Sequence, residues 1–309
     1  MPQDYAKLET EKVNPYTRQI DQCSTLEMVR LINDQDAHVA AAVRAEDAHI
    51  AAAVDLIVES FQKGGRLIYF GAGTSGRLGV VDASECVPTF GVSPDLVQGF
   101  IAGGDGALRV PVENAEDDPN EGVRVLEQVK ANEKDVVCGI SASGGAPCVL
   151  GFLREGKRRG AATIGLCTNP GAPLAEICDV TIAPNVGPEV LSGSTRMKSG
   201  TAQKMVLNML TTCAMIRLGK AYGNLMVDLV ATNQKLRSRA LRLTKEATGA
   251  DEEICKACLE KAGGHVKTAI LMVLTGLDAS DAREALSRTS GHLRQAIATV
   301  QEGKHAIDG

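Results

Sequence analysis

The stretch Arg66-Leu-Ile-Tyr-Phe-Gly-Ala-Gly-Thr-Ser-Gly-Arg77 joins a short apolar run to a turn of glycine and hydroxyl residues. Residues 67–70 are too few for a helix and rich in β-forming side chains, so they predict a buried strand. The glycines let the backbone turn sharply, and a helix beginning near Gly76 would point its free N–H groups at the same place. Because helix N-termini attract phosphate, this stretch predicts an anion site.

The glycine spacing also matches the G-x-G-x-x-G pattern of dinucleotide-binding folds. That interpretation requires an acidic residue at the end of the next strand, about 20 residues further on. The next strand candidate, residues 96–101, ends instead in Ala102-Gly103-Gly104, with Asp95 at its start. The pattern therefore favours the terminal phosphate of a small ligand over a dinucleotide.

The composition excludes several classes of protein. The 309 residues include 33 basic and 38 acidic side chains, a net charge of −5, and no basic run, so nucleic acid is not an expected partner. No apolar stretch reaches the roughly 18 residues that a membrane span needs, and the N-terminus has no signal-peptide core. We expect a cytoplasmic protein without a membrane partner. The nine cysteines follow no disulfide framework, so reduced thiols are expected.

The fold class predicted from the pattern is α/β, with a doubly wound parallel sheet, because strands alternate with helices from residue 96 onward. The expected strands are residues 67–70, 96–101, 135–140, 161–167 and 179–183. Turns at 71–76, 141–145 and 187–195 each precede an expected helix, and they gather at the carboxyl edge of the sheet, where ligands bind. The first of these helices is expected to break at Cys86-Val87-Pro88, which places Glu85 at its end.

Further helices are expected before and after the strands of this sheet along the chain. Residues 1–23 predict an irregular arm, Ser24-Thr-Leu-Glu27 forms a capping box that opens a helix, and Asp36 can cap a second helix that runs to Gly64. Beyond Gly223 the pattern is helical only, with a connecting helix and then three or four short helices within residues 250–302. The expected domains are residues 1–225 and 226–309.

Serines in the glycine-containing turns are the first functional candidates: Ser75, Ser141, Ser143 and Ser194. They are interpreted as ligands of phosphate or sugar hydroxyls, with ordinary helix caps as the alternative. A serine nucleophile would need a base, and no histidine lies near these turns in the sequence. The five histidines are scattered and no His-Glu-x-x-His occurs, so no metal site is expected. Cys255-x-x-Cys258 has no second pair and is interpreted as structural.

Carboxylates are the second group of candidates. Glu85 ends an apolar stretch with no neighbouring cation, and partial burial there would raise its pKa toward the range of a general acid. Glu113 and Glu116 precede a helix that Asp118-Pro-Asn-Glu121 is expected to open. A solvated acidic face is the alternative for this pair.

Four motifs together resemble the N-acetylmuramic acid 6-phosphate etherase family, almost end to end. They are Gly71-Ala-Gly-Thr-Ser-Gly-Arg-Leu-Gly79, Asp82-Ala-Ser-Glu-Cys86 with Pro88-Thr-Phe-Gly91, Val112-Glu-Asn-Ala-Glu-Asp117, and Gly187-Pro-Glu-Val-Leu-Ser-Gly-Ser-Thr-Arg-Met-Lys-Ser-Gly-Thr201. The last is shared with the glucokinase regulatory protein. The resemblance implies a sugar isomerase (SIS) domain, a small helical tail like a ubiquitin-associated domain, and a homodimer.

The resemblance also implies an activity, which is a carbon–oxygen lyase reaction. The D-lactyl ether of N-acetylmuramic acid 6-phosphate is cleaved by elimination and hydration to N-acetylglucosamine 6-phosphate and D-lactate, in cell-wall amino-sugar recycling. By position in the motifs, Glu85 matches the acid and Glu116 the second catalytic glutamate, expected to be the base. No metal or organic cofactor is implied. The positions that match phosphate and sugar ligands are Thr74, Ser75, Gly76, Ser141, Ser143, Gly144, Ser194 and Lys198.

Two departures from the family pattern bear on affinity for the phosphate. Family members commonly carry Pro-Pro where this chain has Val87-Pro88, and Arg-Thr where it has Gly145-Ala146, so a cation and a hydroxyl are absent near an expected phosphate turn. A regulator that senses a sugar phosphate without converting it is the alternative function. An aldose–ketose isomerase is a third interpretation, which the motif at 187–201 disfavours.

Overall fold

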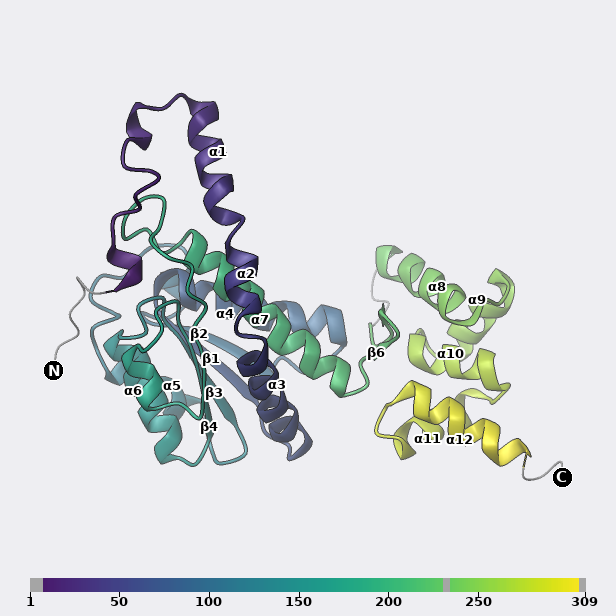
Figure 1. Cartoon of the computed structure of the whole chain (residues 1–309). Helices are drawn as coiled ribbons and strands as arrows, with labels where there is room; N and C mark the ends of the chain where they lie inside the picture. The colour runs from purple at the N-terminus through teal and green to yellow at the C-terminus, as the bar shows by residue number, and fades with distance from the viewer. Residues whose placement is uncertain (1–7, 230–233, 306–309) are drawn as a thin grey trace. The chain divides into compact units, whose positions relative to one another are not determined.

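The computed structural model of the protein describes residues 8–229 and 234–305. The chain divides into two compact units, one comprising residues 1–84 and 94–211 and the other residues 85–93 and 212–309. The first unit contains a parallel sheet and the second is mainly helical (Figure 1).

The sheet has five strands in the order β2-β1-β3-β4-β5, and every pair of neighbours is parallel. Their bounds are β1 Leu67–Gly71, β2 Val97–Ile101, β3 Val136–Ile140, β4 Ala162–Leu166 and β5 Val180–Ile182. All residues of β1 and β3 are buried, because helices cover both faces of a parallel sheet. The predicted doubly wound sheet and its five strands are confirmed, with end points that differ by a residue or so.

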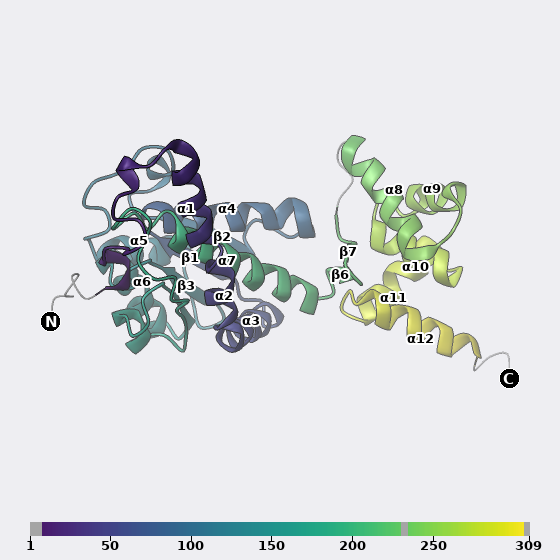
Figure 2. The same ribbon diagram turned by 45° about the horizontal axis from the view of Figure 1, so that its top comes forward.

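Helices lie on both sides of this sheet. They are α3 Asp47–Gln62, α4 Gly73–Phe90, α5 Asn120–Gln128, α6 Pro147–Arg158 and α7 Lys198–Arg217. Figures 1 and 2 both show α5 and α6 on one side of the sheet and α3 on the other. The core beneath α6 is marked by Phe70 and Phe152, whose rings stack with centroids 5.0 Å apart. Burial of such aromatic pairs fixes α6, and with it the turn that precedes it.

The N-terminal segment begins with two short 3-10 helices, Glu9–Glu11 and Ile20–Gln22, followed by α1 Thr25–Asp36. The capping box that opens α1 is confirmed, because Ser24 and Glu27 exchange backbone and side-chain hydrogen bonds. The single helix expected from Asp36 to Gly64 is wrong. It is divided into α2 Val39–Arg44 and α3 at Glu46, whose N–H bonds to the carbonyl of Val43 three residues back and whose carboxylate accepts the N–H of Ala183, just beyond β5.

The expected break of α4 at residues 86–88 is also wrong, since the helix runs to Phe90. Pro88 lacks an N–H, so it costs the helix only the hydrogen bond to the carbonyl of Ser84, an exposed residue that solvent can reach. Gly91 then closes the last turn with its N–H on the carbonyl of Val87, 3.0 Å away. Glu85 therefore lies inside a helix and not at its end.

The helical unit confirms the expected small bundle. In the part of this unit that the structure describes, a hairpin of β6 Ala221–Tyr222 and β7 Leu225–Met226 precedes five helices: α8 Gln234–Thr248, α9 Glu252–Lys261, α10 Val266–Thr275, α11 Ala279–Arg288 and α12 Leu293–His305. Nearly all of α10 is buried, so the other helices pack around it.

All nine cysteines are free thiols, and most are buried. Burial raises the pKa of Cys167 to about 11, and burial beside the carboxylate of Glu116 raises that of Cys148 to about 12. These thiols are packed as small apolar side chains and are poor nucleophiles. Among the described residues, no helix is both long enough and apolar enough to cross a bilayer.

Candidate active site

The strand order of the sheet reverses between β1 and β3. The chain passes from β1 to β2 on one side of it and then returns to β3 on the other side. Ligands of doubly wound folds bind in the crevice at such a reversal. A cavity of about 260 Å³ lies at the carboxyl ends of these two strands. Its lining residues come from five segments of the first unit: Thr10, Glu11, Ala72, Gly73, Thr74, Ser75, Glu116, Ile140, Ser141, Ala142, Ser143, Ala146, Gly193 and Thr195.

The turn between β1 and α4 forms one wall. A Cβ on Gly76 would lie 2.5 Å from the carbonyl oxygen of Gly71, so only glycine permits this close return of the backbone. The helix begins at Gly73, earlier than the expected Gly76, and Gly73, Thr74 and Ser75 of its first turn line the cavity. Ser75 is buried, and its hydroxyl donates to Oε1 of Gln203 on α7 across 2.9 Å.

The turn between β3 and α6 forms a second wall and is held by its own hydroxyl groups. Oγ of Ser141 accepts the N–H of Gly144 at 3.1 Å, Oγ of Ser143 accepts the N–H of Gly145 at 3.2 Å, and the two hydroxyls lie 3.2 Å apart. Gly144 has a φ of 70°, a conformation that favours glycine. Ala146 lines the cavity at the position where the family commonly has threonine.

The two glutamates expected to act in catalysis are placed differently. Glu116 lines the cavity, and its main-chain carbonyl accepts the N–H of Cys148 at 3.0 Å, which fastens its loop to the first turn of α6. Glu85 is exposed and belongs to the second unit, so its expected burial is wrong. Because α4 continues to Phe90, Glu85 lies on an outward face of that helix. Glu113 is exposed and does not line the cavity.

In the segment 187–201, the residues that line the cavity are sequence neighbours of the predicted Ser194 and not Ser194 itself. Gly193 and Thr195 line the cavity, whereas Ser194 between them is half-buried and does not. Lys198 points elsewhere, since its Nζ donates to the carbonyl of Val186 at 2.8 Å and borders a separate open cavity. Burial lowers the pKa of Lys198. The structure therefore does not bring Lys198 to the candidate site.

Sequence reasoning missed three features of this site. Thr10 and Glu11 reach it from the N-terminal segment, although no motif indicated that this segment approaches the sheet edge. Buried Glu189 caps α7, because its carboxylate oxygens accept the N–H groups of Lys198 at 3.0 Å and Ser199 at 2.9 Å. Its position nine residues before the start of α7 is too far for a capping pattern to be recognised.

Within the described ranges, no three metal-ligating side chains come together.

Relatives of this chain carry a common name. A protein of Actinobacillus pleuropneumoniae serotype 7 called N-acetylmuramic acid 6-phosphate etherase is 51% identical over 87% of this chain and 89% of its own length. Proteins of the same name from Caldanaerobacter subterraneus and Aliivibrio fischeri are 54% and 53% identical over 87–88% of this chain and 88–91% of theirs. The chain belongs to the N-acetylmuramic acid 6-phosphate etherase family. It is an enzyme family, so the regulator interpretation is not supported.

Other comparisons of this family member agree with the fold. Two family models match, described as the glucokinase regulatory protein N-terminal SIS domain over residues 49–157 and the SIS domain over residues 125–213. A solved structure described as a putative phosphosugar isomerase involved in capsule formation, from Bacteroides fragilis, aligns with a TM-score of 0.50. It is 21% identical and covers 65% of this chain and 95% of its own. This similarity shows the SIS fold.

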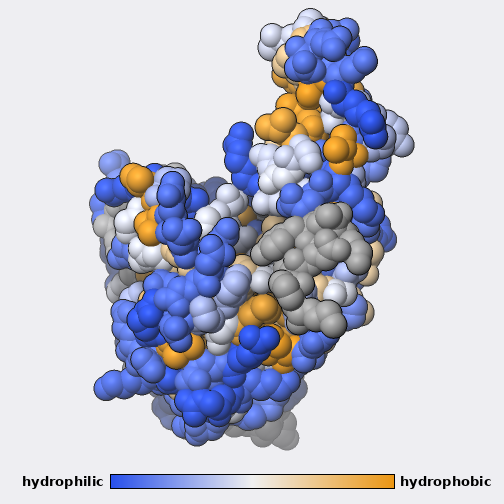
Figure 3. Space-filling view, turned by 90° about the vertical axis from the view of Figure 1, so that its left-hand side faces the viewer, coloured by the Kyte–Doolittle hydropathy of each residue, from blue (hydrophilic) through white to orange (hydrophobic). Residues whose placement is uncertain are grey.

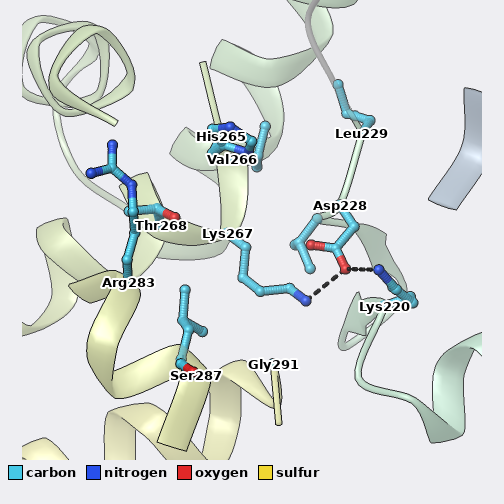
Figure 4. Close-up of a pocket in the computed structure, with 12 residues that line it drawn as sticks. Lys220, Asp228, Leu229, His265, Val266, Lys267, Thr268, Arg283, Ser287 and Gly291 are labelled. Carbon is cyan, nitrogen blue, oxygen red and sulfur yellow. Dashed lines mark hydrogen bonds and ion pairs between the residues drawn. The ribbon is translucent and has the colours of Figure 1, made fainter. Parts of the chain in front are cut away.

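This etherase family member also has a cavity of about 400 Å³ in its helical unit (Figure 4). Oδ2 of Asp228 accepts from Nζ of Lys267 at 2.7 Å and from Nζ of Lys220 at 3.1 Å. The side chain of Lys267 is only 10% exposed, and burial lowers its pKa although Asp228 opposes the shift. This cluster joins the segment after the β6–β7 hairpin to α10.

Proposed function

We propose that the protein cleaves the D-lactyl ether of N-acetylmuramic acid 6-phosphate with water, as a carbon–oxygen lyase, to give N-acetylglucosamine 6-phosphate and D-lactate. The observation that carries this proposal is the identity of 51–54% to proteins named for this etherase activity. It is supported by the cavity at the sheet edge, where Glu116 lies beside two turns rich in hydroxyl and N–H groups.

The phosphate is proposed to bind between the start of α4 and the turn that contains Ser141 and Ser143. No lysine, arginine or histidine is among the described residues that line the cavity. Binding of the dianion would therefore depend on N–H groups at the helix N-terminus and on hydroxyl groups. Donation of both hydroxyl protons to phosphate would exchange the bond between the Ser141 and Ser143 hydroxyls and leave in place the backbone N–H groups that they accept.

The proposed reaction begins with the open-chain sugar, in which the C1 aldehyde makes the C2 proton acidic. Glu116, as base, removes this proton, the C3–O bond breaks, and an acid protonates the departing lactyl oxygen. Glu85 does not line the cavity, and we propose it as that acid only from its place in the motif Asp82-Ala-Ser-Glu-Cys86. Water then adds at C3 of the unsaturated aldehyde and a proton returns to C2, so no redox partner is needed.

The experiment that tests this function follows D-lactate release from N-acetylmuramic acid 6-phosphate in deuterated water, with analysis of the product sugar at C2. Lactate formed together with deuterium at C2 is the expected result. A protein that binds the phosphosugar and releases no lactate contradicts the proposal and favours a sensing role. Interconversion of aldose and ketose phosphates would favour an isomerase instead.

We also propose that the protein forms a homodimer. Helix α1 has no buried residue, and its Leu26 and Val29 are 58% and 48% exposed. In the space-filling view, apolar atoms gather on this projecting part of the first unit (Figure 3). An apolar helix face without a covering partner is typical of an association surface. Sedimentation equilibrium gives the mass of the protein in solution, and a monomer at micromolar concentration contradicts the proposal.

The cytoplasmic location stays a prediction.

A further inference from the structure

The cavity at the sheet edge contains a second carboxylate. Glu11 ends the short helix Glu9–Glu11 and lines the cavity together with Glu116. We propose that Glu11 contacts the substrate, and that its carboxylate accepts hydrogen bonds from uncharged donors of the phosphosugar and so positions it. This inference rests on the proposed phosphosugar function and adds a substrate-positioning residue from the N-terminal segment.

The backbone of this segment is fixed to both neighbouring loops. Thr10 is fully buried, its N–H donates to Oδ1 of Asn169 at 3.4 Å, and Nδ2 of Asn169 donates to Oγ1 of Thr10 at 3.2 Å. The same Nδ2 donates to the carbonyl of Ala142 at 2.8 Å. On the other side, the hydroxyl of Ser192 donates to the carbonyl of Glu11 at 3.2 Å. Glu11 is therefore held in register with the turns on both sides of the cavity.

The carboxylate of Glu11 is available to a ligand. Within residues 8–229 and 234–305 no hydrogen bond or ion pair engages it. Its Oε2 would lie only 3.5 Å from a Cβ on Gly193, where glycine leaves the carboxylate uncovered. An ionised carboxylate that accepts no bond from the protein retains its full acceptor capacity for donors of a ligand.

The charge of the cavity decides which part of the ligand reaches Glu11. Glu11 and Glu116 are the charged side chains among its described lining residues, and both repel a phosphate. The phosphate is consequently directed to the N–H and hydroxyl groups of the two turns. Glu11 then faces the uncharged donors of the sugar, which are hydroxyl groups and the acetamido N–H.

The test compares Glu11→Gln with the parent protein in calorimetric titrations with N-acetylglucosamine 6-phosphate and with inorganic phosphate. Loss of a charged acceptor is expected to weaken phosphosugar binding by about tenfold or more and to leave phosphate binding within about twofold. Glutamine has the same length and retains the carbonyl contact with Ser192. Glu9→Gln is the matched control, because Glu9 lies in the same short helix, pairs with Lys12 and borders a different cavity.

Three outcomes overturn the inference: phosphosugar affinity unchanged in Glu11→Gln, an equal loss of affinity for phosphate, or an equal loss in Glu9→Gln. Equilibrium binding needs no turnover. A parent protein that binds N-acetylglucosamine 6-phosphate but releases no lactate from N-acetylmuramic acid 6-phosphate would contradict the proposed function and still test Glu11. 2-Deoxyglucose 6-phosphate, which has no donor at C2, identifies the donor. A loss that disappears with this sugar assigns the acetamido N–H, and a loss that persists assigns a hydroxyl group.

Discussion

The cavity at the sheet edge and the cavity of the helical unit use opposite means of arranging charge. The cavity at the sheet edge has fixed N–H and hydroxyl donors on two turns and carboxylates on its other walls, with no cation among its described lining residues. The cavity of the helical unit has two lysines that share one aspartate oxygen. Backbone donors are placed by the fold itself, whereas the stability of a cluster of buried side-chain charges depends on the presence of every charged group in it. The first arrangement suits recognition, and the second suits attachment of a hairpin to a helix.

The largest expected effect concerns the glutamates assigned to the reaction. Glu116→Gln and Glu85→Gln are each expected to lower kcat for lactate release by about 10²- to 10⁴-fold, because neither amide can move the proton assigned to that position. Unfolding midpoints should stay at the parent value, since both side chains are exposed. Steady-state kinetics and urea titrations measure the two quantities. Parent rates in both variants would contradict the assignment.

The second effect concerns stability in the helical unit. Asp228→Asn leaves Lys267 and Lys220 facing each other without a counter-charge, so we expect the free energy of unfolding to fall by about 2–3 kcal/mol. Phosphosugar affinity should not change. Glu284→Gln, which breaks an exposed pair with Arg288, is the control and should leave the unfolding midpoint unchanged. If Asp228→Asn weakens phosphosugar binding instead, the division of roles between the cavities is wrong.

A smaller effect is expected where the phosphate turn departs from its family. Ala146→Thr restores a hydroxyl at a position that lines the cavity. One additional hydrogen bond contributes about 1 kcal/mol, which corresponds to a roughly fivefold lower Kd for inorganic phosphate. Ala146→Val has the same shape without the hydroxyl and should not tighten binding. Equal affinities for the threonine and valine variants would place the phosphate elsewhere.

The smallest effect is a pH dependence of stability that belongs to the helical cavity. Burial lowers the pKa of Lys267 in the folded protein, so between that pKa and about 10.4 the unfolded chain binds more protons than the folded one. The free energy of unfolding should therefore rise as pH increases through this window. Lys267→Met should flatten the rise, as measured by urea unfolding at several pH values. An identical slope in parent and variant would exclude Lys267 as its source.

The sequence predicted the features that depend on local patterns. Short apolar runs that alternate with helical segments located the five strands, and hydroxyl-rich turns located two walls of the cavity, because a parallel sheet brings such turns to one edge. Contacts between distant segments left no pattern. Thr10 meets Asn169 across 159 positions, so neither it nor Glu11 could be assigned to the site. Lys198 was assigned from its place in the motif at 187–201, whereas the first turn of α7 directs its side chain to Val186.

The hydrogen bond from Cys148 to the carbonyl of Glu116 has one further consequence. It joins the loop of the proposed base to the helix that follows the proposed phosphate turn, so the main chain sets the spacing between this turn and the loop of the base. Positional isomers of a sugar phosphate differ in the distance from phosphate to reacting carbon. Discrimination between a 6-phosphate and a 1-phosphate would then follow from backbone spacing, and substitutions of lining side chains would change affinity without changing which isomer reacts.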